Sequence, residues 1–223
     1  MVSPHYDDAP LSLGQSMLDG DLAAATVTVG IVFGRSNWTR YFHPTERRWP
    51  IASAIRLFEE CVNAWRFRYR IRVGHLRECI LRTGETDPSV YLDPSHDVTD
   101  DPLVAEVADL VDAWAGRADL TLVPLGLGGH VDHRIVAQAG RGLAARGHPV
   151  AFYEDRPYAC WLSDADLIAA ARTVVPDGHP VAVSGPITLA KRDRLWYPSQ
   201  IDDYFSEAMD LDEQGGRRER TWS

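Results

Sequence analysis

Two short clusters of histidine and aspartate contain the side chains best suited to binding divalent metals and moving protons. The first is His5-Tyr6-Asp7-Asp8 near the start of the chain, and the second is His130-Val131-Asp132-His133 in its middle. Each cluster follows a short apolar stretch and opens onto a stretch with helical periodicity, which indicates a strand-to-helix turn. Two histidines and one carboxylate leave a coordination position for water or substrate, as catalytic zinc sites do. The pattern indicates a metal-dependent hydrolase site built from two distant loops.

The first cluster taken alone has a simpler interpretation. His5 and Asp8 are three residues apart, and Pro10 suits the first turn of a helix that we expect over residues 11–18. Aspartate is favoured at helix N-termini, so Asp7 and Asp8 could be nothing more than helix caps. The second cluster, which follows a glycine-rich loop, favours the metal site instead. Asp7 would then stay off the metal and be available as a general base.

Composition limits the class of protein. The chain has 223 residues, of which 45% are hydrophobic and 25% charged, so we expect a single globular domain over residues 1–223. Residues 210–223 are charged and contain glycine, which predicts a loose tail. The net charge of -9 gives no attraction to phosphate backbones, so we expect no nucleic-acid partner.

Cysteine usage and hydropathy indicate the compartment. The three cysteines are widely spaced and form no C-x-x-C pattern, which is typical of a reduced, cytoplasmic chain. No apolar run approaches the roughly 20 residues that a membrane helix requires, so we expect no membrane insertion.

The elements that must position the two clusters follow from the apolar pattern. Buried parallel strands are expected at residues 26–34, 120–125, 150–153 and 181–184, and helices at 51–67, 102–114, 132–145 and 165–174. This alternation predicts an α/β, Rossmann-like three-layer fold with a mostly parallel sheet and an active site at the C-terminal ends of its strands. Only four residues precede His5, so either the first strand is very short or the chain is truncated there.

Two other segments could contribute to a pocket. Residues 35–50 are rich in aromatic residues, arginine and proline, which indicates a long irregular loop, and Arg35 could contact substrate from it. Glu154 and Asp155 follow the strand expected at 150–153, where they could face the site or belong to a solvated loop.

The residues around both clusters resemble the LmbE-like, or PIG-L, family of metal-dependent N-deacetylases. Residues 3–12, Ser-Pro-His-Tyr-Asp-Asp-Ala-Pro-Leu-Ser, are similar to the first signature of the family, and residues 129–133, Gly-His-Val-Asp-His, to its second. Weaker likenesses are Tyr-Pro-Ser-Gln at 197–200 and Glu-Arg-Thr-Trp at 219–222. Together these matches span almost the whole chain.

The resemblance implies a Rossmann-like fold and a bound divalent ion. Its ligands would be His5, Asp8 and His133, and the ion would usually be zinc, although iron(II) or another divalent ion suits the same ligands. By the same resemblance Asp7 is the general base.

The second signature and the remaining likenesses imply further roles. His130 with Asp132 would stabilise the tetrahedral intermediate and protonate the leaving amine. Arg56 resembles a substrate-contacting arginine of the family, and Tyr197 and Gln200 are further candidates for substrate contacts. The resemblance implies a small-molecule substrate, namely an N-acetylated amino sugar, a glycoside or a natural product that contains one.

Two positions depart from the family pattern. Ala9 stands where many members have glutamate, which leaves the metal ligands intact. Gly128 stands where some members have a tyrosine that assists the oxyanion. Oxyanion stabilisation would therefore come from the metal, from His130 or from another residue.

Three other functions fit part of this pattern. An amidase that cleaves a larger acyl group or a thiol conjugate would share the mechanism and differ in its pocket. Non-haem iron enzymes also use two histidines and one carboxylate, but the parallel α/β pattern and the unspent Asp7 count against oxygen chemistry. A binding protein without turnover is the third alternative, favoured only by Gly128 and the abrupt beginning of the chain.

Overall fold

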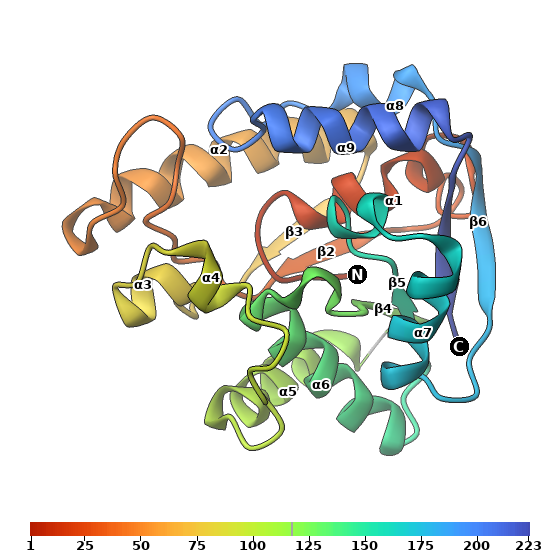
Figure 1. Cartoon of the computed structure of the whole chain (residues 1–223), viewed down its shortest axis with the longest axis horizontal. Helices are drawn as coiled ribbons and strands as arrows, with labels where there is room; N and C mark the ends of the chain where they lie inside the picture. Colours follow the sequence, from red (N-terminus) through yellow and green to blue (C-terminus); the bar gives the residue numbers. More distant parts are fainter. Residues whose placement is uncertain (117) are drawn as a thin grey trace.

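The strands form two sheets in the computed structural model, which describes residues 1–116 and 118–223 (Figure 1). The first sheet is parallel and has the order β1-β2-β3, with β1 at Val2–Ser3, β2 at Thr28–Ile31 and β3 at Arg70–Val73. The second is mixed and has the order β4-β5-β7-β6, with β4 at Thr121–Pro124, β5 at Val150–Tyr153, β7 at Arg218–Trp222 and β6 at Pro180–Pro186. Strands β4 and β5 are parallel, whereas β7 is antiparallel to both of its neighbours.

Helices lie on both sides of the strands. Figure 1 shows α2, α8 and α9 on one side and α5 and α6 on the other. The α-helices are α1 (Asp8–Asp19), α2 (Trp49–Phe67), α3 (Cys79–Thr83), α4 (Pro88–Tyr91), α5 (Pro102–Ala115), α6 (Val131–Ala145), α7 (Asp164–Val174), α8 (Leu189–Arg194) and α9 (Asp203–Gln214). Short 3-10 turns occur at η1 (Glu46–Arg48), η2 (Leu127–Gly129) and η3 (Tyr158–Trp161).

Alternation along the strands divides the apolar interior into two clusters. Phe152 of β5 belongs to the cluster under α5, α6 and α7, whereas its neighbours Ala151 and Tyr153 belong to the cluster under α1 and α2. Successive side chains of a strand point to opposite faces, so β5 is covered on both. The strands are thus fixed by packing, and the loops that leave their ends are held in place.

Most of the expected elements are confirmed. The five expected helices correspond to α1, α2, α5, α6 and α7, and each boundary lies within a few residues of the expected one. The strands expected at residues 26–34, 120–125 and 150–153 correspond to β2, β4 and β5. In the part of the chain that the structure describes, no helix combines the length and apolar character needed to cross a membrane.

The expectation of a loose tail at residues 210–223 is wrong. Residues 210–214 complete α9, and β7 lies between β5 and β6 with Trp222 fully buried. The composition of this segment indicated a solvated tail because β7 contains charged residues. Their ion-pair partners are distant in sequence and therefore could not be recognised locally. The buried carboxylate of Glu219 pairs with Lys191 at 2.9 Å, and Arg220 pairs with Glu154 at 2.7 Å.

The strand expected at residues 181–184 exists as β6, but it is not a buried parallel strand. Among the strands that the structure describes it pairs only with β7, in antiparallel orientation, and Val181 is 46% exposed. An edge strand exposes one side to solvent, so its apolar residues reflect β propensity more than burial.

Candidate metal and active site

The two histidine–aspartate clusters meet because β1 contacts β4 and each cluster follows one of these strands. His5 follows β1 directly, whereas His133 lies on the first turn of α6, after β4 and the η2 turn. The site therefore lies after the C-terminal ends of β1 and β4, each of which pairs in parallel with a neighbouring strand. Open α/β sheets bind their ligands at such ends.

Glycine is required in the loop before the second cluster. Gly126, Gly128 and Gly129 all have left-handed backbone conformations, with φ of 77°, 76° and 79°. Side chains other than glycine adopt this region at a cost. At Gly128 a Cβ atom would also lie 2.2 Å from the ring of Tyr158, so that ring fills the space that a side chain at Gly128 would occupy.

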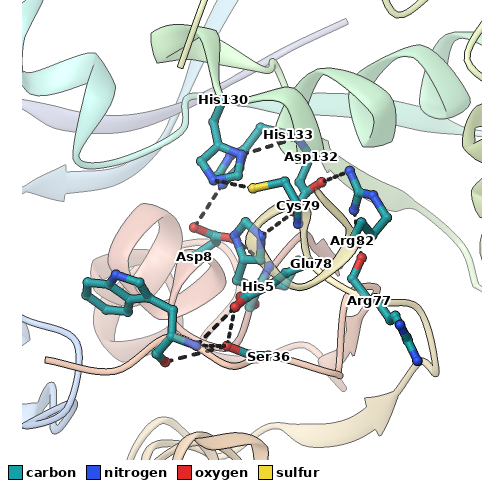
Figure 2. A network of polar contacts seen from close by, with 12 residues as sticks. His5, Asp8, Ser36, Arg77, Glu78, Cys79, Arg82, His130, Asp132 and His133 are labelled. Carbon is teal, nitrogen blue, oxygen red and sulfur yellow. Dashed lines mark hydrogen bonds and ion pairs between the residues drawn. The ribbon is translucent and has the colours of Figure 1, made fainter. Parts of the chain in front are cut away.

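His5, Asp8 and His133 present donor atoms that all lie within 4.8 Å of one another, and the three residues are buried. His5 Nδ1 lies 3.5 Å from Asp8 Oδ2, and His133 Nε2 lies 3.3 Å from Asp8 Oδ1. Figure 2 shows the three side chains pointing toward one another. Nitrogen and carboxylate donors at this spacing fit a divalent ion such as zinc.

Aspartates hold both imidazoles in the orientation that ligation requires. His5 Nε2 lies 3.0 Å from Asp132 Oδ2, and His133 Nδ1 lies 2.7 Å from Asp155 Oδ1. Each ring therefore donates one N–H to a carboxylate and turns its other nitrogen toward Asp8. Histidine ligands of metals are oriented in this way by outer carboxylates.

Asp132 has a different partner from the expected one. Its carboxylate contacts His5 instead of His130, and it also accepts hydrogen bonds from Arg82 Nη2 at 2.7 Å and from the backbone N–H of Cys79 at 2.9 Å (Figure 2). Only the backbone N–H of Asp132 bonds to His130. Asp132 thus orients the imidazole of His5, one of the three candidate metal ligands.

A second group of metal-type donors, His5, His130 and Asp132, fits an ion less well. It shares His5 with the first group, and the three contacts of Asp132 leave its oxygens occupied by N–H donors. Those donors would compete with a cation for the same lone pairs. The group with Asp8 is the better candidate.

Asp7 is buried beside the ligands but contacts neither histidine. It precedes α1 as the N-cap residue, yet its side chain makes no capping hydrogen bond, so the interpretation of Asp7 as a helix cap does not hold. Its Oδ1 lies 3.5 Å from Arg56 Nη2. Burial and the neighbouring charge of Asp8 raise the pKa of Asp7 to about 6, against the opposing effects of Arg56 and His5.

The charges of the ligands are strongly coupled. Burial alone would raise the pKa of Asp8, but His133 and His5 hold it well below its usual range. Burial likewise opposes the charged form of His5, while Asp132 and Asp8 raise its pKa to about 9. The field of the carboxylates thus favours positive charge at this point, as a metal site requires.

His130 folds back onto its own helix. It is the N-cap residue of α6, and its Nδ1 accepts a hydrogen bond from the backbone N–H of Asp132 at 3.2 Å. The neutral ring therefore carries its hydrogen on Nε2, which lies 3.9 Å from Cys79 Sγ. Burial and the charges of His5 and His133 hold the pKa of His130 well below its usual value.

Arg56 lies in the site, although mainly as a partner of protein carboxylates. Its Nη1 bonds to Glu78 Oε2 at 2.9 Å and to Ser36 Oγ at 2.8 Å, and its Nη2 faces Asp7. This network fixes the guanidinium on the buried face of α2. Arg56 is placed to orient Asp7.

The Tyr-Pro-Ser-Gln segment at 197–200 is anchored to α2 by two glutamates. Glu59 accepts hydrogen bonds from the backbone and hydroxyl of Ser199 and from Gln200 Nε2, and Glu60 contacts the Tyr197 hydroxyl at 2.6 Å. Tyr197 is buried away from the cavity, whereas Gln200 lines it. Of these two candidates for substrate contacts, the structure brings only Gln200 to the site.

Arg35 is also outside the cavity. Its side chain is exposed and its guanidinium lies over the ring of Trp49, 5.6 Å from the centroid. The loop at 35–50 still contributes Trp38 to the cavity.

The ligands and Asp7 open into a cavity of about 420 Å³, within the range typical of small-molecule sites. Its wall includes residues that the sequence pattern did not single out, namely Glu78, Cys79, Tyr91, Tyr158, Asp202 and Tyr204. The sequence left open whether Asp155 faces the site or lies in a solvated loop. Asp155 is buried and contacts His133, so it belongs to the site. Its place directly after β5 was the available signal.

Solved deacetylase structures share this fold. The A40926 pseudoaglycone deacetylase Dbv21 has a TM-score of 0.62 and 22% identity, over 99% of this chain and 94% of its own. The zinc-inhibited form of the teicoplanin deacetylase Orf2 has a TM-score of 0.61 and 20% identity, over 99% and 95% of the two chains. At these identities the likeness concerns the fold alone.

Sequence comparison identifies closer relatives, although no family model matches the chain. The 2'-N-acetylparomamine deacetylase of Niallia circulans is 26% identical over 70% of this chain and 66% of its own length. The 2'-N-acetylparomamine deacetylase of Streptomyces fradiae is 34% identical over 225 aligned residues, which cover 91% of this chain and 73% of that enzyme. The chain therefore belongs to the same family of deacetylases as the Streptomyces fradiae enzyme.

Proposed function

We propose that the protein is a metal-dependent hydrolase of the LmbE-like type that removes an N-acetyl group from an amino sugar or an amino-sugar natural product. The observation that carries the proposal is the pairing of a His5–Asp8–His133 donor set with a buried Asp7 that binds neither histidine ligand. The names of the relatives support the same reaction, because both act on an N-acetylated amino sugar.

His5 Nδ1, the carboxylate of Asp8 and His133 Nε2 would hold the ion. Zinc fits these ligands, and iron(II) or another divalent ion is the alternative. A bound divalent ion supplies Lewis-acid polarisation of the acyl oxygen and lowers the pKa of water from 15.7 toward about 7.

Asp7 is the general base of the proposed reaction. Its carboxylate has no capping role, and the guanidinium of Arg56 holds it beside the ligands. A carboxylate in this place takes a proton from the attacking water once that water is acidified. The main role of Arg56 is then to orient the carboxylate of Asp7, and a contact with substrate would be a second role.

His130 is the proposed hydrogen-bond donor to the acyl oxygen, since its low pKa keeps the ring neutral and leaves it no proton to give to the leaving amine. Because Nδ1 accepts the N–H of Asp132, the hydrogen on Nε2 is available to donate to the developing oxyanion. The proton that Asp7 takes from water would pass to the leaving amine, whereas His130 would keep its hydrogen and share it with the acyl oxygen. Gln200 completes the wall as a hydrogen-bonding group for the sugar.

We also propose that the two sheets form one Rossmann-like layer with the strand order β3-β2-β1-β4-β5. Strand β1 lies beside β4, and the Tyr153 hydroxyl of β5 donates to the carbonyl of Val2 in β1 at 2.9 Å. Apolar clusters on both faces support a three-layer arrangement.

The test is release of acetate from 2'-N-acetylparomamine and N-acetylglucosamine by protein loaded with one equivalent of zinc. Wild type should release acetate, and Asp7→Asn should lose at least about a hundredfold in kcat, because general-base catalysis contributes about 10²–10⁴. Equal metal content in the two proteins, measured by mass spectrometry, separates loss of the base from loss of the ion. Metal-loaded wild type that releases no acetate would refute the deacetylase, and release of a longer acid from other N-acyl amines would favour the amidase alternative.

A further inference from the structure

The cavity contains one carboxylate, Asp202, that forms no ion pair with a cation of residues 1–116 or 118–223. We propose that Asp202 binds an ammonium group of the substrate, so that the site selects amino sugars that carry a positive charge besides the acetylated nitrogen. This inference rests on the proposed function and names the residue that would set its substrate preference.

The charges that line the cavity lead to this assignment. Its carboxylates are Asp7, Asp8, Glu78 and Asp202, and among the described lining residues Arg56 is the one with a permanent positive charge. The guanidinium of Arg56 forms ion pairs with Glu78 at 2.9 Å and with Asp7 at 3.5 Å. A divalent ion at the ligands would balance Asp7 and Asp8. The charge of Asp202 then remains, and an incoming cation would balance it.

Asp202 makes a single side-chain contact. It is the N-cap residue of α9, and its Oδ1 accepts the backbone N–H of Phe205 at 3.2 Å. In the described parts of the chain no arginine, lysine or histidine forms an ion pair with it, and no hydrogen bond is made to Oδ2. The second oxygen is therefore available to a ligand in the cavity.

Two neighbours in the same segment favour a polar sugar beside Asp202. Gln200 also lines the cavity, is only 1% exposed and has a side-chain carbonyl, Oε1, that lacks a hydrogen-bond partner among the described residues. A buried acceptor without a partner is costly, and a hydroxyl or N–H of the substrate would satisfy it. Its presence is an observation independent of the charge of Asp202.

Tyr204 adds an aromatic face to the same wall. Its ring stacks on Trp161 with centroids 5.3 Å apart and an interplanar angle of 18°, and both rings are partly exposed. Tyrosine and tryptophan present large rigid apolar faces, which suit the C–H surface of a sugar ring. Gln200, Asp202 and Tyr204 thus offer an acceptor, an anion and a stacking face along one segment.

The experiment compares Asp202→Asn with Asp203→Asn. Asparagine keeps the Oδ1 acceptor that caps α9 and removes only the charge, so the helix should be retained. Asp203 is the next residue, is exposed and does not line the cavity, so it is a matched control for the change in net charge. Binding of paromamine is measured by calorimetry at low and high salt, and kcat/KM is measured for 2'-N-acetylparomamine and for neutral N-acetylglucosamine.

Removal of the negative charge of Asp202 should lower the affinity for the cationic ligand. We expect Asp202→Asn to weaken paromamine binding about tenfold, as loss of a charge-assisted hydrogen bond does, and to abolish most of its salt dependence. The kcat/KM preference for the cationic over the neutral substrate should fall by a similar factor, mainly through KM. Asp203→Asn should leave both quantities within about twofold.

Other outcomes separate this inference from the proposed function. Unchanged paromamine binding in Asp202→Asn, equal effects of the two variants, or no binding by wild type would overturn the role of Asp202 even if acetate is released. Binding that depends on Asp202, without acetate release from either substrate, would refute the deacetylase and leave the ammonium site supported.

Discussion

At the scale of single residues, the orientation of the two imidazoles matters most. His5 is held by Asp132 of α6, and His133 is held by Asp155, which follows β5. Each of the two proposed histidine ligands is thus oriented by an aspartate from another element. The orientation of His5 therefore depends on the second cluster, and that of His133 depends on the segment after β5.

We predict that Asp155→Asn lowers zinc affinity by about tenfold or more. Asp155 uses both oxygens, Oδ1 for His133 and Oδ2 for the backbone N–H groups of Gly126 and Leu127 at 2.9 and 3.2 Å. Asparagine has one acceptor for these donors, so one side of the contact is lost. Competition with a chromophoric chelator measures the affinity directly, without reference to turnover.

The control for Asp155→Asn is Asp177→Asn, which makes the same chemical change at an exposed position in the turn after α7. It should bind zinc as wild type does. Unchanged zinc affinity in Asp155→Asn would show that His133 does not depend on this carboxylate, or that the ion is held elsewhere.

At the scale of elements, the helical backbone geometry of α1 is interrupted, and the side chains of Lys191 and Glu219 bond to backbone groups near the interruption. Leu13 has non-helical backbone angles, φ of -132° and ψ of 19°. The backbone N–H groups of Gln15 and Ser16 donate to Glu219 at 2.9 and 2.7 Å, and Lys191 Nζ donates to the carbonyl of Leu11. Lys191 and Glu219 are themselves paired at 2.9 Å. The interruption, which lies in the helix that follows the first cluster, is therefore stabilised by β7 and α8.

We predict that Glu219→Gln destabilises the fold by about 3 kcal/mol, because it leaves the buried ammonium of Lys191 without its counter-charge. Chemical unfolding measures the difference. Glu207→Gln, at an exposed position of α9, should change stability by less than about 0.5 kcal/mol. If the Lys191→Met, Glu219→Gln double variant is as unstable as the sum of its single changes, the pair is not coupled.

The elements that sequence predicted are those with continuous apolar runs or clear helical periodicity, such as β5 and α5. Strand β3, Arg-Ile-Arg-Val, alternates charged with apolar residues, and strand β7, Arg-Glu-Arg-Thr-Trp, begins with three charged residues, so both escaped prediction. Their place in a sheet depends on pairing with β2, β5 and β6, which local sequence does not encode.

The site was predictable in part for a similar reason. Motif spacing and family resemblance indicated His5, Asp8 and His133, and the structure brings their donor atoms together. The pairing of Asp132 with His5 depends instead on how the loop after β1 meets the first turn of α6, so it could not be inferred from spacing. Glu78 carries no sequence signal, because its role depends on the buried side chain of Arg56.

At the scale of the whole molecule, a buried carboxyl joins α2, the first cluster and the segment at 197–200. Glu60 is fully buried, and the Tyr197 hydroxyl lies 2.6 Å from Glu60 Oε2 and 3.0 Å from the carbonyl of Tyr6. One phenolic hydrogen cannot serve both acceptors. A protonated Glu60 resolves the contact, since it donates to Tyr197, which then donates to Tyr6. Burial raises the pKa of Glu60 to about 8, against the hydrogen bonds from Tyr197 and Tyr69.

This carboxyl should make the stability of the whole fold depend on pH. The pKa of Glu60 is higher in the folded state than its usual value of 4.5. The contribution of Glu60 to the free energy of unfolding is therefore complete below pH 4.5 and is lost as the pH rises from 4.5 to about 8. Over that interval Glu60 alone should lower the free energy of unfolding by about 1.4 kcal/mol per pH unit. Glutamine resembles the protonated acid, since its amide can donate to Tyr197 and its carbonyl can accept from Tyr69. We therefore predict that Glu60→Gln matches wild type near pH 5 and is the more stable protein at pH 9, by urea unfolding at both pH values. A variant less stable than wild type at pH 9 would mean that the fold stabilises the ionised form of Glu60, so that its pKa is not raised, and Tyr197 would then have to donate to Glu60 and release Tyr6.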